Sequence, residues 1–158
     1  MFNSFQMSKI LSAITFTLIS AGFVAQAQQP TPPKPPNKHA VVTAAQVNGV
    51  YRYYDNEFRI LALGHGKLKV QFDGVYHTIS KSVNTGYASG EATIEGNIAS
   101  FKPEDNEPCE ITLVFLPNKL KVEQSGSDAE CGFGHNVNAT GVYRKIRSGK
   151  PKFEEPPE

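Results

Sequence analysis

Residues 109–147 read CEITLVFLPNKLKVEQSGSDAECGFGHNVNATGVYRKIR, and this stretch decides the fold. It contains two segments in which apolar and polar residues alternate, both cysteines of the chain, a glycine-rich loop and a last alternating segment. That last segment begins with Gly-Val-Tyr-Arg at residues 141–144, and the same tetrapeptide stands at residues 49–52. Alternation with a period of two indicates β-strands that bury one face. We therefore expect an all-β fold whose last strand returns to its first.

A closed barrel accounts for this pattern better than an open sheet, because the two end strands of an open sheet leave their backbone groups unpaired. A two-layered sandwich is the alternative fold. Over residues 46–147, alternating runs are interrupted by turn residues at intervals of about eight to twelve positions. This spacing predicts a small antiparallel up-and-down β-barrel of about eight strands. The residues expected to close it are Gly49, Tyr51, Gly141, Tyr143 and Arg144.

The first two segments of the quoted stretch form a predicted hairpin. A four-residue turn with Pro117 in its first central position would pair Phe115 with Leu120 and Leu113 with Val122. These four side chains then share one face, as a half-buried hairpin requires.

The chain has two cysteines, Cys109 and Cys131, and we expect one disulfide between them. Extending the hairpin ladder places Cys109 near Gly126, a few residues before Cys131, so a bridge across the open end of the hairpin is plausible. Closing a loop of this length contributes about 3 kcal/mol by the chain-entropy estimate. That is a large share of a net stability of about 5–15 kcal/mol.

Earlier strand pairings follow from where the apolar side chains must point. A three-residue loop at residues 64–66 would pair Leu63 with Lys67 and Ile60 with Val70. A two-residue loop would turn half of the apolar side chains outward, because a shift of one residue exchanges the two faces of a strand. The sequence therefore predicts the three-residue loop.

A second reversal is expected at residues 73–74, where Asp-Gly is typical of a type I′ hairpin turn. This turn would place His77 opposite Val70, on the inner face. Residues 86–101 predict two further strands with a turn at Gly-Asn, residues 96–97, and their register stays open.

The N-terminal residues 1–27 have the features of a signal peptide. Lys9 is the only charged residue before an apolar run at residues 10–24, and Ala-Gln-Ala at residues 25–27 fits the pattern that signal peptidase cleaves. The run is short for a transmembrane span. We expect cleavage near Ala27 and a soluble bacterial protein, periplasmic or secreted, with no stable membrane anchor.

Two further segments flank the predicted barrel domain of residues 46–147. Residues 28–45 form a proline-rich spacer, which favours extended polyproline II structure or, alternatively, could dock in an aromatic groove. Residues 148–158 are rich in proline and charge and are predicted to be disordered. The formal net charge of +1 lacks the basic footprint of a nucleic-acid-binding protein, so no nucleic acid partner is expected.

The glycine-rich loop after Cys131 provides the candidates for contact with a partner. Phe133 either plugs one end of the barrel or stands exposed as an anchor, and His135 and Asn136 follow it. His65, in a predicted turn, is the fourth candidate. As a nucleophile, Cys131 would need a free thiolate, which the expected disulfide removes.

No catalytic or metal-binding pattern stands out. The four histidines lack the short spacings of a zinc site, and no two carboxylates are arranged as a general acid and base. We therefore expect a non-enzymatic protein that uses no metal and no cofactor. An enzyme built on His77, His135 and scattered carboxylates is the remaining alternative.

The chain resembles the bacterial C-type lysozyme inhibitors of the membrane-bound and periplasmic types. The resemblance rests on the expected export signal, the meander of short strands and the expected disulfide. It also rests on the run at residues 131–134 (Cys-Gly-Phe-Gly) that leads to residues 141–143 (Gly-Val-Tyr). The resemblance covers residues 47–146. It implies a small barrel that inserts a loop with serine and lysine positions into the lysozyme cleft. The sequence assigns no residue to that loop.

A second likeness is to lipocalins, which open with Gly-x-Trp packed against a basic residue of the last strand. Here residues 49–51 (Gly-Val-Tyr) would pack against Arg144 or Arg147, although the chain has no tryptophan. We expect an exported binding module whose partner is a protein, as for an inhibitor or immunity protein acting on a cell-wall hydrolase such as lysozyme. A carrier of a small apolar ligand is the alternative.

Overall fold

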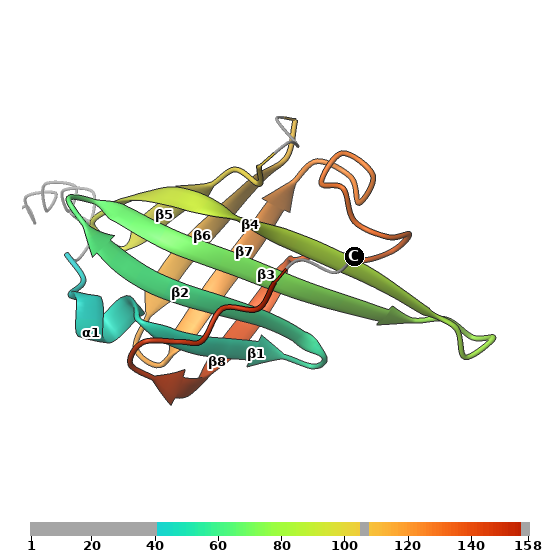
Figure 1. The fold of residues 1–158 in the computed structure, drawn as a ribbon, viewed down its shortest axis with the longest axis horizontal. Coiled ribbons are helices and arrows are strands. Elements are labelled where there is room, and N and C mark those ends of the chain that lie inside the picture. Colours follow the sequence, from blue (N-terminus) through green and yellow to red (C-terminus); the bar gives the residue numbers. More distant parts are fainter. Residues whose placement is uncertain (1–40, 105–107, 156–158) are drawn as a thin grey trace, which may run out of the picture. The chain divides into compact units, whose positions relative to one another are not determined.

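A computed structural model describes residues 41–104 and 108–155, and within them eight antiparallel strands form a closed barrel (Figure 1). Each strand pairs with its neighbours in sequence, and β8 pairs with β1, so the predicted barrel is confirmed. The predicted signal peptide, residues 1–27, and residues 28–40 of the predicted spacer lie outside the described residues. The elements are α1 (Ala44–Val47), β1 (Gly49–Tyr53), β2 (Asn56–Gly64), β3 (Lys67–His77), β4 (Val83–Glu95), β5 (Ile98–Phe101), β6 (Glu110–Leu116), β7 (Lys119–Ser125) and β8 (Gly141–Ser148).

The repeated tetrapeptide lies at the seam between β1 and β8, as the sequence predicts. Tyr51 is opposite Lys145 and Arg52 is opposite Arg144, with a register shift between Val50 and Tyr51. The lipocalin likeness predicted that Arg144 or Arg147 would pack against this segment. Instead, the ammonium of Lys145 lies over the Tyr51 ring, 5.1 Å from its centroid.

Both copies of the repeat build the same local structure. The Tyr51 hydroxyl donates to the Val47 carbonyl at 2.8 Å, and the Tyr143 hydroxyl donates to the Ala139 carbonyl at 2.7 Å, four residues back in each case. Burial raises the pKa of both phenols. Each tyrosine therefore fills the core with its ring and satisfies a buried carbonyl with its hydroxyl. The helix α1, which the sequence did not indicate, supplies the Val47 carbonyl.

Aromatic rings connect this seam, through β2 and β3, to the β7–β8 connection. Tyr143 contacts Phe58 with centroids 5.0 Å apart, Phe58 contacts Phe72 at 4.8 Å, and Phe72 contacts Phe133 at 5.1 Å. All four side chains are buried. The row is part of one core, which also includes Ile60, Leu68, Val70, Phe101, Ile111, Leu113, Phe115, Leu120 and Val122.

The β2–β3 connection is partly as predicted. Ile60 is opposite Val70, but the final pair is Gly64 with Lys67, because the register shifts between Ala62 and Gly64. The loop between the paired residues is therefore two residues long. The shift absorbs one residue, which keeps the apolar side chains of β2 and β3 pointing inward.

The predicted turn at Asp73-Gly74 is wrong, and so is the inner position of His77. β3 continues straight through both residues to His77, which is exposed and opposite Val83. Gly74 is instead required by space. A Cβ at this position would lie 2.6 Å from the Phe72 ring and from Val137. Tertiary packing therefore decides this position, and the local turn preference of Asp-Gly is overridden.

The remaining hairpins agree with the sequence. Glu95 pairs with Ile98 across the turn at residues 96–97, and Phe115 pairs with Leu120 across the turn that contains Pro117. Leu113 is opposite Val122.

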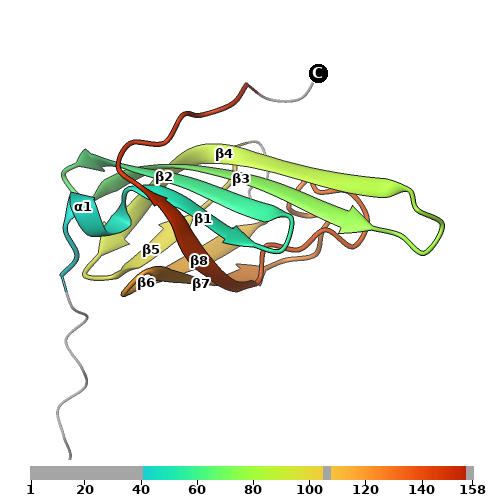
Figure 2. The same cartoon turned by 90° about the horizontal axis from the view of Figure 1, so that it is seen from below.

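The C-terminal tail, predicted to be disordered, is ordered as far as residue 155 and crosses the outer face of the barrel (Figure 2). Pro151 is buried, and Glu154 forms hydrogen bonds with Gln71 of β3. The composition of the tail indicates disorder, but composition does not reveal a docking surface on another strand. Residues 156–158 lie outside the described residues.

Replacing Gly74 by alanine should destabilise the barrel by about 1–3 kcal/mol, because a methyl group there overlaps Phe72 and Val137. Denaturant unfolding measures the loss. Thr85→Val, on the exposed face of the same ribbon, is the control and should leave the midpoint nearly unchanged. Equal midpoints for Gly74→Ala and the parent would contradict the packing described here.

Candidate functional site

The four residues predicted to contact a partner are divided between the two ends of the barrel. His65, in the β2–β3 turn, lies at the end that carries α1. Phe133, His135 and Asn136 lie in the β7–β8 connection at the opposite end, which we call the disulfide end. The structure therefore does not bring His65 together with the other three.

At the disulfide end, β3 and β4 continue beyond their neighbours as a two-stranded ribbon (Figures 1 and 2). The last β3 residue paired with β2 is Asp73, and β4 begins to pair with β5 only at Ala92. From Gly74 to His77, β3 pairs with β4 alone. We call residues 74–86 the finger.

The tip of the finger is an ordered turn. The Thr78 amide donates to the Ser82 carbonyl at 2.9 Å, and the Lys81 amide donates to the Thr78 carbonyl at 3.0 Å. The Thr78 hydroxyl lies 2.6 Å from the Ser82 hydroxyl and 2.9 Å from the Ser80 hydroxyl. Between these bonded residues, Ile79 is fully exposed, at 105% of its reference area. The tip thus presents an apolar side chain on a turn that is already fixed.

A loop of the β7–β8 connection supports the base of the finger. The Gly134 amide donates to the Thr85 carbonyl at 2.9 Å, and the Asn84 side chain donates to the His135 carbonyl at 2.6 Å. A Cβ on Gly86, which is opposite Gly74, would lie 2.8 Å from Val137 and 2.9 Å from Phe133. The two facing glycines therefore let this loop pack directly beneath the ribbon.

On its other side the finger is held by the β1–β2 turn. The Asn56 side chain accepts a hydrogen bond from the Val75 amide at 2.8 Å and donates to the Asn138 carbonyl at 3.1 Å. His77 Nε2 lies 3.2 Å from the Asp55 carboxylate, and both side chains are exposed. Asn56 therefore ties the finger and the β7–β8 loop to the same turn.

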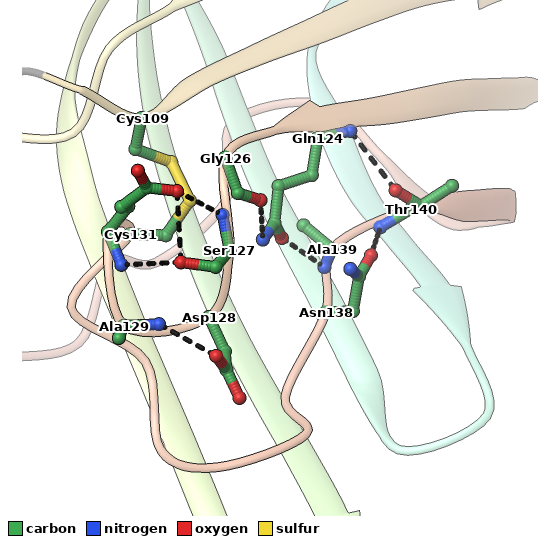
Figure 3. The surroundings of a disulfide bond; sticks show 11 residues. Cys109, Gln124, Gly126, Ser127, Asp128, Ala129, Cys131, Asn138, Ala139 and Thr140 are labelled. Atoms are coloured by element: carbon green, nitrogen blue, oxygen red, sulfur yellow. Dashed lines mark hydrogen bonds between the residues drawn. A yellow bond between two sulfur atoms is a disulfide. The ribbon is translucent and has the colours of Figure 1, made fainter.

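The predicted disulfide joins Cys109 to Cys131, with Cα atoms 4.8 Å apart and both residues fully buried (Figure 3). It fixes Cys131, in the β7–β8 loop, to the residue directly before β6. Gln124 holds the other end of the loop: its side chain accepts from the Ala139 amide at 2.8 Å and donates to the Gly126 carbonyl at 3.1 Å.

Two carboxylates order the turn between these anchors. The Asn136 amide donates to Asp128 at 2.6 Å and the Ala129 amide at 2.9 Å, and these bonds hold the Asp128 pKa below its usual value. Glu130 accepts from the Ser127 amide at 2.7 Å and the Ser127 hydroxyl at 2.9 Å, which lowers its pKa as well. Both carboxylates are therefore stabilised in their charged form by the folded loop.

The predicted contact residues have different environments within this loop. Phe133 is buried beneath the finger, which fits the plug and not the exposed anchor. His135 has an exposed side chain, 3.4 Å from Asp128, and Asn136 is exposed with a left-handed φ of 65°. Of the three, only His135 and Asn136 can reach a partner directly.

The sequence did not predict the finger tip. The expected turn at Asp73-Gly74 placed the residues that follow, including His77, in a strand returning along the barrel. One signal was present. Gly86, Ala88, Gly90 and Ala92 are small residues at a period of two, and the last three lie opposite the large side chains of Phe72, Val70 and Leu68. This spacing of small residues indicates the inner face of a strand that pairs with β3.

The described residues contain no group of three or more His, Cys, Asp or Glu side chains that could hold a metal ion. Nor does this part of the chain include a helix long and apolar enough to cross a membrane. Comparison of the chain with protein-family models, with curated proteins and with solved structures found no match.

The lowered pKa values of Asp128 and Glu130 predict an acid-sensitive loop. Stability from these groups is present above their ordinary values of 3.8 and 4.5, and it is lost as the pH falls toward their lowered folded values. Thermal unfolding between pH 6 and pH 3 should therefore show a smaller loss of Tm for Asp128→Asn/Glu130→Gln than for the parent. Glu95→Gln is the control and should follow the parent. Parallel curves for the double variant and the parent would contradict this role.

Proposed function

We propose that this chain is an exported, non-enzymatic binding protein that inserts its finger into a concave site of a partner protein. The observation that carries the proposal is the tip itself, where Ile79 is fully exposed on a turn fixed by main-chain and hydroxyl hydrogen bonds. A preformed turn loses little conformational entropy when it binds, so its apolar contact is retained as affinity.

Further apolar surface lies on the finger. Tyr76 is 38% exposed and Val83 is 50% exposed, and they project from opposite faces of the ribbon behind Ile79. A ribbon with contact residues at its tip and on both faces fits a cleft that encloses it, and a flat surface would contact only one face. Aromatic residues are frequent among the side chains that dominate binding energy at protein interfaces.

The chemistry of the tip supports a cell-wall hydrolase as the partner class. Lys81, with a left-handed φ of 67°, stands between Ser80 and Ser82 at the end of the finger. Glycoside hydrolases use a pair of carboxyl groups in a cleft that binds hydroxyl-rich substrates. A lysine flanked by hydroxyls complements such a cleft in charge and in hydrogen bonding, and it matches the serine and lysine loop that the lysozyme-inhibitor resemblance implies.

The alternative, a carrier of a small apolar ligand, would need space inside the barrel. The interior positions are occupied by large side chains, among them Phe58, Phe72 and Tyr143 in mutual ring contact. Two pockets, of about 380 Å³ and 420 Å³, lie beside α1, and another of about 410 Å³ lies beside Arg59 and Glu154. No observation on the interior favours a carrier. The buried disulfide is compatible with a periplasmic or secreted location.

Inhibition assays test the proposal. The mature chain, residues 28–158, is added in excess to a panel of lysozymes and other wall-degrading enzymes, and the rate of cell-wall lysis is recorded. We expect stoichiometric inhibition of at least one enzyme, and we expect Ile79→Asp and Lys81→Glu each to weaken it by about tenfold or more, as central contact residues do.

Lys119→Glu, which makes the same charge change at the α1 end, is the matched control and should inhibit like the parent. Unchanged lysis rates across the whole panel would exclude the inhibitor. Full inhibition by both tip variants would exclude the finger as the contact surface.

A further inference from the structure

The outer face of β3 carries a polar side chain that is buried although it does not point into the barrel interior. Gln71 points outward, between the inward-facing Val70 and Phe72, yet it is only 1% exposed. It is the only polar residue in the described part of the chain that reaches this degree of burial. The C-terminal tail covers it.

Gln71 binds the tail through main-chain atoms of one residue. Its Nε2 donates to the Glu154 carbonyl at 2.9 Å, and its Oε1 accepts from the Glu154 amide at 3.0 Å. Nε2 also lies within hydrogen-bond distance of the Tyr87 hydroxyl, at 3.1 Å. A primary amide that pairs with both main-chain groups of a residue acts like a neighbouring β-strand, so it selects an extended backbone.

Side chains around Gln71 add preference for particular residues. The Lys69 ammonium lies 4.6 Å from the centroid of the Phe153 ring, a cation–π contact. The Arg59 guanidinium contacts Glu154 at 2.7 Å while also pairing with Glu57 and Asp73. Arg59 is 12% exposed, so it is a largely buried cation placed to receive a carboxylate.

The electrostatics of the surrounding face agree with a site that the tail closes. Burial raises the pKa of Asp73, and the neighbouring Arg59 opposes this effect only in part. Pro151 is buried two residues before Phe153. Gly149, with a left-handed φ of 89°, gives the chain the turn it needs between β8 and the tail.

We propose that this outer face is a recognition groove for an extended peptide segment of the order proline, any residue, aromatic, acidic, and that residues Pro151–Glu154 are its exchangeable resident ligand. The barrel closes through β1 and β8 without the tail, and the groove reads main-chain atoms through a polar amide. Side chains that are permanently buried are mostly apolar. A primary amide, in contrast, can form hydrogen bonds with water once the segment leaves.

The groove and the finger are separate surfaces, because Gln71 lies in the middle of the barrel wall and the finger lies at the disulfide end. The two proposals therefore fail or succeed independently. The tail is attached to its groove, which gives an effective concentration on the order of 1 mM. A free peptide must exceed this competition before it can bind the unmodified protein.

The test uses the mature chain with Phe153→Ala/Glu154→Pro, which removes the ring and the amide donor of the tail. The probe is a capped peptide with the sequence of residues 149–156, GKPKFEEP. In NMR titrations, the side-chain amide resonances of Gln71 should shift with saturation at a Kd of about 0.1 mM or below in this variant. In the unmodified protein the apparent affinity should be at least about tenfold weaker, since the groove is occupied.

Two controls make the result specific. A peptide with alanine and proline in place of its phenylalanine and first glutamate should not bind. Adding Gln71→Leu to the tail-released variant should abolish binding of the original peptide, as followed by the backbone amide resonances of β2 and β3. A concentration-dependent dimer of the unmodified protein, with the tail of one copy in the groove of another, would support exchange. The proposal is overturned if the released variant shows no saturable shift, if released and unmodified proteins bind equally, or if Gln71→Leu leaves binding intact.

Discussion

The packing of Phe133 and Val137 against the facing glycines Gly74 and Gly86 is the contact on which the disulfide end depends. It joins a loop held by a disulfide to a ribbon whose outer half has no other strand beside it. The same Phe133 ring ends the aromatic row that begins at Tyr143 in the closure seam. Barrel closure and finger position are therefore parts of one packed core. The disulfide contributes about 3 kcal/mol to this arrangement by the chain-entropy estimate.

Much of the fold could be read from the sequence, because its signals were local. Alternation, the repeated Gly-Val-Tyr-Arg and the turn at Pro117 gave the barrel, its seam and one hairpin in correct register. The failures were non-local. Asp73-Gly74 is a strong turn signal by itself, and only contact with Val137, over sixty residues later, makes that glycine part of a straight strand. The docked tail was missed similarly, because Gln71 gives no sign in sequence that a segment will cover it.

The candidate site was harder to predict than the fold. The cysteine pair was correctly identified, since two cysteines allow one pairing, and the loop after Cys131 does lie at an exposed barrel end. Its Phe133 is internal, however, and Ile79, the most exposed large apolar residue in the described part of the chain, was assigned to no site. Exposure at the tip results from the length of β3 and β4 relative to their neighbours, which no single segment encodes. Local signals such as Ser-x-x-Glu at residues 127–130, a pattern typical of capped turns, were available and indicate an ordered loop.

The disulfide-held loop fixes the finger, and backbone hydrogen exchange measures this directly. The amides of residues 75–85 are compared between the oxidised protein and the Cys109→Ser/Cys131→Ser variant, with residues 58–72 of β2 and β3 as the internal reference. Val137→Ala, which keeps the disulfide, serves as a second variant. In both variants, exchange in the finger should accelerate much more than exchange in the reference strands. Finger amides that stay as protected as in the parent, relative to the same reference strands, would contradict it.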